Sequence, residues 1–336
     1  MGINSHEVGK ITDYNFNLYY NLEVFMGKLA FIFPGQGAQY VGMGKDIAAE
    51  YKSADAIFDA ATEALGFDIK EMIFNGDDET LKITENTQPT IVATSVACMQ
   101  PLLEKGIKPD FVAGLSLGEY AAHVAAGTMS FTDAVALVRK RGKFMQEAVP
   151  VGVGAMSAII GLDNEAVIES CKEASAVGVC EPANFNCPGQ LAIAGEAAAV
   201  ERANELCKAK GAKRALMLAV SAPFHCSLLK PAGEKLAAEL EKITLNDMKV
   251  PVVVNVSAKA VTNKEEVKET LIKQVSNSVL WENCVKTMID QGVDTFVEIG
   301  PGKVLSGFVK KIYKDVKVLN VENIESLNTT LDELSK

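Results

Sequence analysis

From residue 26 onward, short apolar runs alternate with longer stretches in which apolar positions recur at helical spacing. The runs at 29–33 and 111–113 are followed directly by proline or glycine, which is typical of buried strands. Amphipathic helices are predicted at 44–65, 90–104, 117–126 and 131–148. This alternation of strands and helices predicts an α/β fold with a mostly parallel sheet.

The pattern changes after the glycine-containing segment 150–154. The order of predicted elements there is βαββαβ, with strands at 155–160, 177–180, 190–194 and 215–220 and helices at 165–174 and 197–210. This order is the signature of a ferredoxin-like unit. We therefore expect a small ferredoxin-like subdomain at 151–222, inserted in a large domain formed by 26–150 and 223–336. Residues 1–25 are expected to be an N-terminal extension outside the fold.

Composition narrows the classes of function. The net charge is −10, from 33 basic and 43 acidic residues, and no basic stripe carries interleaved aromatics, so we do not expect nucleic-acid binding. No stretch approaches the ~18 continuous apolar residues of a membrane span, and 1–25 lacks the features of a secretory signal. The seven cysteines include no CxxC pair, which predicts reduced, mostly buried thiols and no metal site. A cytoplasmic protein is expected.

The sharpest chemical signal is the segment Gly114-Leu115-Ser116-Leu117-Gly118. It follows a predicted strand and opens a predicted helix, the context that a nucleophile elbow requires. The two glycines let the strand and the helix approach closely, and the serine is left at the tip of the turn. Ser116 is therefore the candidate nucleophile.

A serine nucleophile needs a base, and the chain contains three histidines. His6 lies in the leading segment, and His123 lies two helical turns beyond Ser116, where a packed side chain is expected. His225 follows the predicted subdomain, on a loop that could reach a cleft between the two units. An ordinary loop histidine is the competing interpretation, and elimination favours His225 as the base.

A third, acidic member of a triad is not evident. The acids between Ser116 and His225 fall mostly on amphipathic helices or at their caps, where they are expected to face solvent. We therefore predict a Ser–His dyad whose imidazole is oriented by a group other than a carboxylate.

The loop Pro34-Gly35-Gln36-Gly37 follows the first predicted strand. It lacks the third glycine of a dinucleotide-binding loop, because position 40 is tyrosine. The better interpretation is that a backbone N–H of this loop binds an oxyanion beside Ser116. For Arg141, in the helix after the elbow helix, the residues alone leave two readings open: a solvent-facing arginine, or a buried guanidinium that binds a carboxylate.

Several motifs together resemble the malonyl-CoA:acyl carrier protein transacylases of bacterial fatty acid synthesis and the related acyltransferase domains of polyketide synthases. The matching segments are FPGQGAQ (33–39), GLSLGEY (114–120), RGKFMQEAVP (141–150), NFNCPGQ (184–190), SAPFH (221–225) and EIGPGK (298–303). The resemblance runs in unbroken order over about residues 26–320. It implies an α/β-hydrolase-like large domain with a ferredoxin-like small one.

The resemblance also implies roles for individual residues. Ser116 would carry the acyl group, with His225 as its base. The oxyanion would be bound by the backbone N–H groups of Gln36 and Leu117, and the malonyl carboxylate by Arg141. Asn184 and Gln274 would line the site, with the Gln274 carbonyl orienting the histidine. In the polyketide relatives, a phenylalanine before the base histidine goes with specificity for malonyl. Phe224 stands at that position, where its ring would fill the space of an α-methyl group.

One position departs from the family pattern: Leu115 stands where the family commonly has histidine before the nucleophile. Because that position is not the base, the chemistry is expected to survive. The implied partners are malonyl-CoA and acyl carrier protein, with no metal or redox cofactor, and we expect a monomer. Basic side chains at 208, 210, 213 and 214, or at 310, 311 and 314, are candidates for carrier-protein docking, although a solvated helix end explains either group equally well.

Three alternatives remain open from the sequence. A serine hydrolase of the α/β-hydrolase or lipid acyl hydrolase type would share the elbow, but would not call for a buried arginine. An acyltransferase that serves polyketide synthesis would share every motif. A catalytically inactive module that binds acyl-CoA or carrier protein is disfavoured because Ser116, His225 and Arg141 are all present.

Overall fold

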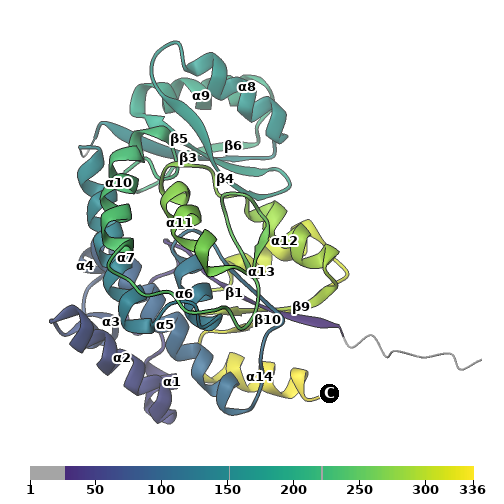
Figure 1. Cartoon of the computed structure of the whole chain (residues 1–336). Helices are drawn as coiled ribbons and strands as arrows, with labels where there is room; N and C mark the ends of the chain where they lie inside the picture. The colour runs from purple at the N-terminus through teal and green to yellow at the C-terminus, as the bar shows by residue number, and fades with distance from the viewer. Residues whose placement is uncertain (1–26, 151, 221) are drawn as a thin grey trace, which may run out of the picture.

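The computed structural model describes residues 27–150, 152–220 and 222–336. Two sheets organise these residues, a six-stranded sheet in the larger part and a four-stranded sheet above it (Figure 1). The expected extension at 1–25 and the start of the fold at Met26 lie outside the described residues.

The six-stranded sheet is mainly parallel, as predicted. Its strand order is β10-β9-β1-β2-β7-β8, and the short β7–β8 pair is antiparallel. The central strand β1 is buried on both faces: Phe31 and Phe33 join one apolar cluster, and Ala30 and Ile32 join another. Burial on both faces explains its nearly continuous apolar sequence. The strands are β1 Lys28–Phe33, β2 Phe111–Gly114, β7 Val252–Val253, β8 Ala260–Val261, β9 Val293–Ile299 and β10 Lys317–Val321.

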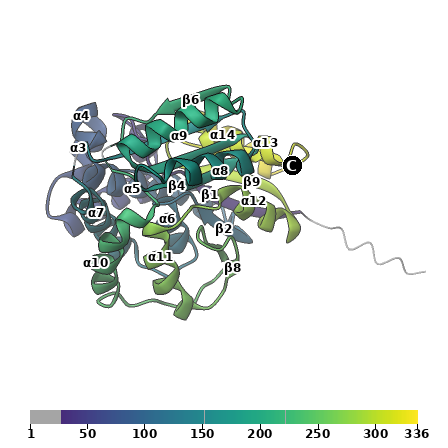
Figure 2. The same ribbon diagram turned by 90° about the horizontal axis from the view of Figure 1, so that it is seen from above.

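Helices cover both faces of this sheet. Figure 2 places α7 and α10 on the opposite side from α12 and α13, in agreement with the separate apolar clusters that these helices join. The helices of this part are α1 Lys45–Glu50, α2 Lys52–Leu65, α3 Ile69–Asn75, α4 Asp78–Lys82, α5 Thr84–Glu104, α6 Gly118–Ala125, α7 Phe131–Ala148, α10 Lys230–Leu240, α11 Val267–Ser276, α12 Trp281–Asp290, α13 Val304–Ile312 and α14 Ile324–Leu334.

The four-stranded sheet is antiparallel, in the order β4-β5-β3-β6. Its outer face is covered by two helices, against which Ile159 and Ile193 pack. Its other face carries Met156, Ala158 and Ala192, which line a cavity toward the large sheet. The chain follows the predicted βαββαβ order as β3 Gly154–Ile160, α8 Asn164–Ala174, β4 Cys180–Cys187, β5 Gln190–Glu196, α9 Ala197–Ala209 and β6 Arg214–Met217.

Some predicted boundaries were wrong. The helix expected at 90–104 begins at Thr84, so Pro89 lies inside it. Tertiary contacts hold its first turns, because Gln88 is buried and accepts a hydrogen bond from Arg141. The helix expected at 44–65 is interrupted at Tyr51, whose backbone is extended. The strand expected at 177–180 runs instead from Cys180 to Cys187.

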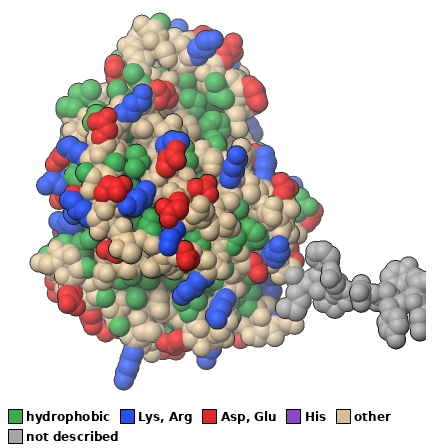
Figure 3. All heavy atoms as spheres, viewed as in Figure 1, with side chains coloured by type: hydrophobic (Ala, Val, Ile, Leu, Met, Phe, Trp, Pro, Cys, Tyr) green, Lys and Arg blue, Asp and Glu red, His purple; other side chains and the backbone are tan. Residues whose placement is uncertain are grey.

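The surface carries interspersed charges of both signs on the face shown in Figure 3. All seven cysteines are unpaired and buried. Within 27–150, 152–220 and 222–336, no helix is long and apolar enough to span a membrane, and no cluster of His, Cys, Asp or Glu is arranged to hold a metal ion.

Two glycines in helices lead to opposite predictions for stability. A Cβ on Gly142 of α7 would lie 2.7 Å from the carbonyl oxygen of Thr84, so Gly142→Ala must push α7 away from α5. We expect the free energy of unfolding to fall by about 1–3 kcal/mol. A Cβ on Gly307 of α13 would have no atom within 4 Å, and Gly307→Ala should raise stability by about 0.5–1 kcal/mol. Urea unfolding of the two variants tests both signs, and equal effects would contradict the packing argument.

Candidate active site

Ser116 lies in the tight turn between β2 and α6. Its φ of 55° is in the left-handed region, which costs a residue with a Cβ about 1–2 kcal/mol. A Cβ on Gly114 would lie 2.0 Å from the carbonyl carbon of Gly118, and a Cβ on Gly118 would lie 2.3 Å from the carbonyl oxygen of Phe33. Glycine at both positions therefore lets β1, β2 and α6 approach closely and leaves the serine at the tip of the turn.

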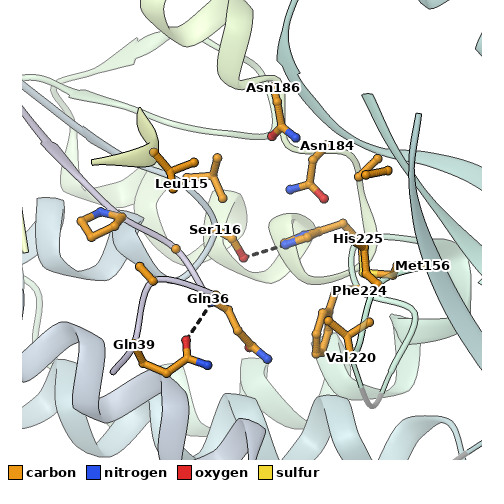
Figure 4. Close-up of a pocket in the computed structure, with 18 of the residues that line it drawn as sticks. Gln36, Gln39, Leu115, Ser116, Met156, Asn184, Asn186, Val220, Phe224 and His225 are labelled. Atoms are coloured by element: carbon orange, nitrogen blue, oxygen red, sulfur yellow. Dashed lines mark hydrogen bonds between the residues drawn. The ribbon is translucent and has the colours of Figure 1, made fainter. Parts of the chain in front are cut away.

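His225 meets Ser116 from the loop that follows the small sheet. Its Nε2 lies 2.6 Å from Ser116 Oγ, the contact dashed in Figure 4. Its Nδ1 lies 2.8 Å from the backbone carbonyl oxygen of Gln274 in α11. Because a carbonyl oxygen can only accept, Nδ1 carries the ring proton and Nε2 is free to accept the Ser116 O–H.

The surroundings of His225 favour its neutral form. Burial, assisted by the nearby Arg141 guanidinium, lowers the pKa of His225 to about 3. The imidazole is therefore unprotonated near neutral pH and able to take a proton. Its backbone φ of 62° is also left-handed. Backbone strain of this kind concentrates at functional sites, where the surrounding structure maintains it.

Arg141 of α7 is buried beside the same pair. Its Nη2 donates to Ser116 Oγ at 3.1 Å and to Gln274 Oε1 at 3.0 Å, and its Nη1 donates to Gln88 Oε1 at 2.8 Å. Arg141 Nε is buried without a hydrogen-bond partner among the described residues, so the guanidinium keeps a free donor. Of the two interpretations left open by the sequence, the buried guanidinium is the one observed.

These groups line a cavity of about 390 Å³ between the two sheets. Asn184 and Phe224 also line it, and Figure 4 shows Gln36 on the opposite side of the Ser116–His225 pair from Asn184. Two candidates are not part of its lining. The Leu117 side chain is buried in the large core, and Gln274 lies behind the reacting groups, where it contacts Ser116, His225 and Arg141.

The backbone N–H groups of Gln36 and Leu117 flank the serine turn. Neither N–H donates a hydrogen bond to any residue in the described parts of the chain. By contrast, the Ser116 N–H is already bound to Asn255 Oδ1 at 2.6 Å. Both N–H groups are therefore free to donate, and their role in binding an oxyanion beside Ser116 Oγ stays a prediction.

Sequence reasoning missed three buried polar residues of this site: Gln88, Glu119 and Asn255. Each bonds to a residue that the sequence did indicate. Burial raises the pKa of Glu119 to about 7, opposed by hydrogen bonds from Asn255 and Gln274. Glu119 lies in the segment GLSLGEY, and the match of that segment to the family could have indicated Glu119 as a residue of the site. Asn255 stands two residues beyond β7, and its position after a short apolar run was the only available hint.

The similarity to known proteins agrees with this geometry. Residues 30–330 match the acyl transferase domain family. Malonyl CoA-acyl carrier protein transacylase of Bacillus subtilis is 49% identical over 93% of this chain and 98% of its own length. This chain belongs to the malonyl CoA-acyl carrier protein transacylase family. The resemblance inferred from the motifs is thereby confirmed, and the chain is an acyltransferase.

Solved structures of the transacylase family share the fold. A malonyl CoA-acyl carrier protein transacylase from Clostridium perfringens is 49% identical, with a TM-score of 0.89 over 92% of this chain and 97% of that one. A malonyl-transacylase in complex with a type II polyketide synthase acyl-carrier protein is 46% identical, with a TM-score of 0.89 over 91% of this chain and 99% of that one. The mixed α/β fold and mainly parallel sheet are common to the family.

The left-handed backbone of Ser116 predicts an unusual order of stability among inactive variants. Ser116→Ala keeps a Cβ in the strained turn, whereas Ser116→Gly removes it. We expect the glycine variant to be more stable by about 1 kcal/mol, despite the greater entropy of glycine in the unfolded chain. Thermal and urea unfolding measure the difference. A clearly more stable alanine variant would contradict the strain assigned to this turn.

His123 provides a test through the pH dependence of stability. Its imidazole is buried with no partner among the residues described, and burial lowers its pKa to about 4. Between pH 6.5 and 4, the unfolded chain takes up a proton at this residue and the folded chain does not, so stability falls as pH falls.

In the variant His123→Leu this contribution is removed. Its free energy of unfolding should decline less steeply from pH 6.5 to 4.5 than that of the wild type, by up to about 1.4 kcal/mol per pH unit. Urea unfolding at several pH values measures both slopes. Parallel pH profiles would show that His123 is not held neutral in the folded state.

Proposed function

We propose that this chain transfers the malonyl group from malonyl-CoA to the phosphopantetheine thiol of acyl carrier protein through an ester on Ser116, supplying the extender unit for fatty acid synthesis. The observation that carries the proposal is the meeting of the Ser116 hydroxyl, the His225 imidazole and the Arg141 guanidinium at one cavity, in a chain of this family. Malonyl-CoA and acyl carrier protein are named for the relatives, and this chain has the side chains that such substrates require.

In the first half-reaction, His225 Nε2 accepts the Ser116 proton as Oγ attacks the thioester carbonyl. The oxyanion is bound by the N–H groups of Gln36 and Leu117, a class of interaction whose loss typically costs about 100- to 1000-fold in rate. The carbon–sulfur bond then breaks, and the coenzyme A thiolate takes the proton from His225. The malonyl ester of Ser116 remains.

In the second half-reaction, His225 accepts the proton of the phosphopantetheine thiol, and the sulfur attacks the ester carbonyl. The carbon–oxygen bond breaks, and Ser116 Oγ recovers its proton from the imidazolium. The exchange is a ping-pong reaction in which the Gln274 carbonyl oxygen keeps Nδ1 protonated throughout. Neither step requires a metal or a redox cofactor.

Arg141 selects the donor. Its guanidinium already contacts Ser116 Oγ, so the free carboxylate of a malonyl group on that oxygen would lie within its reach. A paired carboxylate offsets the cost of burying the cation, and an acetyl group cannot supply it. Asn184 and Gln274 line or support the same region, and Phe224 restricts the space beside the α-carbon.

Carrier-protein docking needs a local cationic surface, since both partners are acidic. Of the two candidate groups, the one near 310–314 lies closer to the cavity, because Lys311 donates to Gln190 Oε1 at 3.4 Å and Gln190 lines the cavity. Lys210 in the other group is already paired with Glu169 and Glu173. We therefore favour the surface around Lys311.

The finer architecture is also part of the proposal. Residues 26–150 and 223–336 form an α/β-hydrolase-like domain, and 151–222 form a ferredoxin-like subdomain that closes the cavity. We further propose a cytoplasmic monomer that binds neither nucleic acid nor membranes. The second candidate function is malonyl transfer to a carrier protein of polyketide synthesis. It is favoured by the similarity to a malonyl-transacylase whose structure was solved in complex with a polyketide synthase carrier protein.

Arg141→Ala tests the carboxylate-binding role. Removal of one partner of a buried charge pair typically costs about 3–5 kcal/mol, so malonyl transfer should fall by at least about 100-fold while acetyl transfer changes far less. Mass spectrometry of the Ser116 adduct after incubation with malonyl-CoA or acetyl-CoA measures both donors. Arg139→Ala is the matched control, because Arg139 lies on the same helix over the Phe67 ring, away from the cavity.

The same experiment separates a transferase from a serine hydrolase. A transferase gives a lasting malonyl adduct on Ser116 that acyl carrier protein discharges. A hydrolase gives rapid release of malonate and little adduct. Near-normal malonyl transfer by Arg141→Ala would contradict the proposed selection, and absence of any wild-type adduct would contradict the transferase function itself.

A further inference from the structure

Three fully buried polar residues lie behind the reacting groups: Glu119 of α6, Asn255 after β7 and Gln274 of α11. None of them lines the cavity. Buried polar side chains are costly unless their hydrogen bonds are satisfied, so a connected group of three needs a structural or functional reason.

Asn255 holds the backbone of the nucleophile turn. Its Oδ1 accepts the Ser116 N–H at 2.6 Å, and its Nδ2 donates to the Gly114 carbonyl oxygen at 2.7 Å. Both peptide groups that surround the turn are therefore fixed by one side-chain amide. This contact maintains the left-handed conformation that presents Ser116 Oγ to His225.

Gln274 contacts all three groups of the proposed chemistry. Its Nε2 donates to the Ser116 carbonyl oxygen at 3.0 Å, its Oε1 accepts from Arg141 Nη2 at 3.0 Å, and its backbone carbonyl accepts from His225 Nδ1 at 2.8 Å. The amide must point one way to do this. If it were flipped, its NH₂ group would face the guanidinium, donor against donor.

Glu119 adds a third contact that favours this orientation of the Gln274 amide, beside those of the Ser116 carbonyl and the Arg141 guanidinium. Its Oε2 accepts the Asn255 backbone N–H at 2.8 Å and Gln274 Nε2 at 2.9 Å. An acceptor at this place favours the orientation with Nε2 toward Glu119 and Oε1 toward Arg141. Its other oxygen, Oε1, is buried and has no partner in the described residues.

We propose that Glu119 is a positioning residue for donor selection: by fixing Gln274, it holds the Arg141 guanidinium where a malonyl carboxylate binds. Glu119 acts through Gln274 and Asn255 and makes no hydrogen bond to Ser116 Oγ or His225 within the described residues. The inference rests on the proposed function, because it assumes that Arg141 selects malonyl.

Two conservative variants distinguish the placement of the acceptor from its charge. In Glu119→Gln, an amide oxygen replaces Oε2 and can accept both N–H groups, while the NH₂ occupies the place of the unpartnered Oε1. Glu119→Asp keeps the carboxyl group but is one methylene shorter, so it withdraws the acceptor by about one bond length, ~1.5 Å. We expect Glu119→Gln to function better than Glu119→Asp.

The readout is the preference for malonyl over acetyl, measured as the ratio of single-turnover rates of Ser116 acylation. This preference should stay within about threefold of the wild type in Glu119→Gln and fall by about 10- to 100-fold in Glu119→Asp, the size expected for loss of a hydrogen bond to a charged group. Glu119→Ala, which removes both the acceptor and the charge, should resemble Glu119→Asp. A variant that only damaged the folded structure would lower the rates of Ser116 acylation by malonyl-CoA and acetyl-CoA equally, and the ratio of the two rates would not change.

Glu282→Gln is the matched control. Glu282 is also a buried glutamate with one bonded oxygen and one that has no partner among residues the structure describes, but it lies on α12 and pairs with Lys286. The preference of the Glu282→Gln variant for malonyl over acetyl should equal that of the wild type. An unchanged ratio in Glu119→Asp and Glu119→Ala, or a loss in Glu119→Gln as large as theirs, would overturn the inference while leaving the proposed function intact. If Arg141→Ala keeps the wild-type preference, the proposed selection fails, and this inference fails with it.

Discussion

The left-handed turn at Ser116 is the constraint on which the rest of the site depends. The close approach of β1, β2 and α6 permits only glycine at 114 and 118, and it leaves the serine in a backbone conformation that a residue with a Cβ adopts at a cost. Such strain persists only where surrounding contacts maintain it. Here the contacts come from Asn255 and Gln274, which bind the peptide groups of the turn.

Burial gives these contacts their strength and determines the state of the ionisable groups. Because His225 and Arg141 are both removed from solvent, the cation disfavours protonation of the imidazole, and the imidazole stays neutral. The cavity between the sheets then combines a neutral base with a buried cation. This pairing suits a substrate that brings its own negative charge, and it offers less to a neutral ester.

Much of this arrangement could be predicted from the sequence, and the physical reason for each failure is specific. The buried strands and the Ser116 turn have local signatures, since sterics at glycine and apolar runs act over a few residues. His225 could be assigned as the base by eliminating the other two histidines. The carboxylate-binding role of Arg141, by contrast, was inferred only from the family resemblance. Asn255 was missed because it contacts Ser116 across 139 positions, and nothing local separates such an asparagine from one in an exposed loop.

A backbone carbonyl stands at His225 Nδ1, where a triad would have an acid, and the same electrostatics explain this choice. A carboxylate in place of the Gln274 carbonyl would stabilise the imidazolium and raise the pKa of His225. It would also lie close to Arg141, since Gln274 contacts both residues, and would compete with a substrate carboxylate for the guanidinium. A backbone carbonyl orients the ring without adding charge. The buried acid nearest this site in the hydrogen-bond network, Glu119, bonds to the Gln274 Nε2, on the other side of the amide from Arg141, where it directs hydrogen bonds and leaves the cation available.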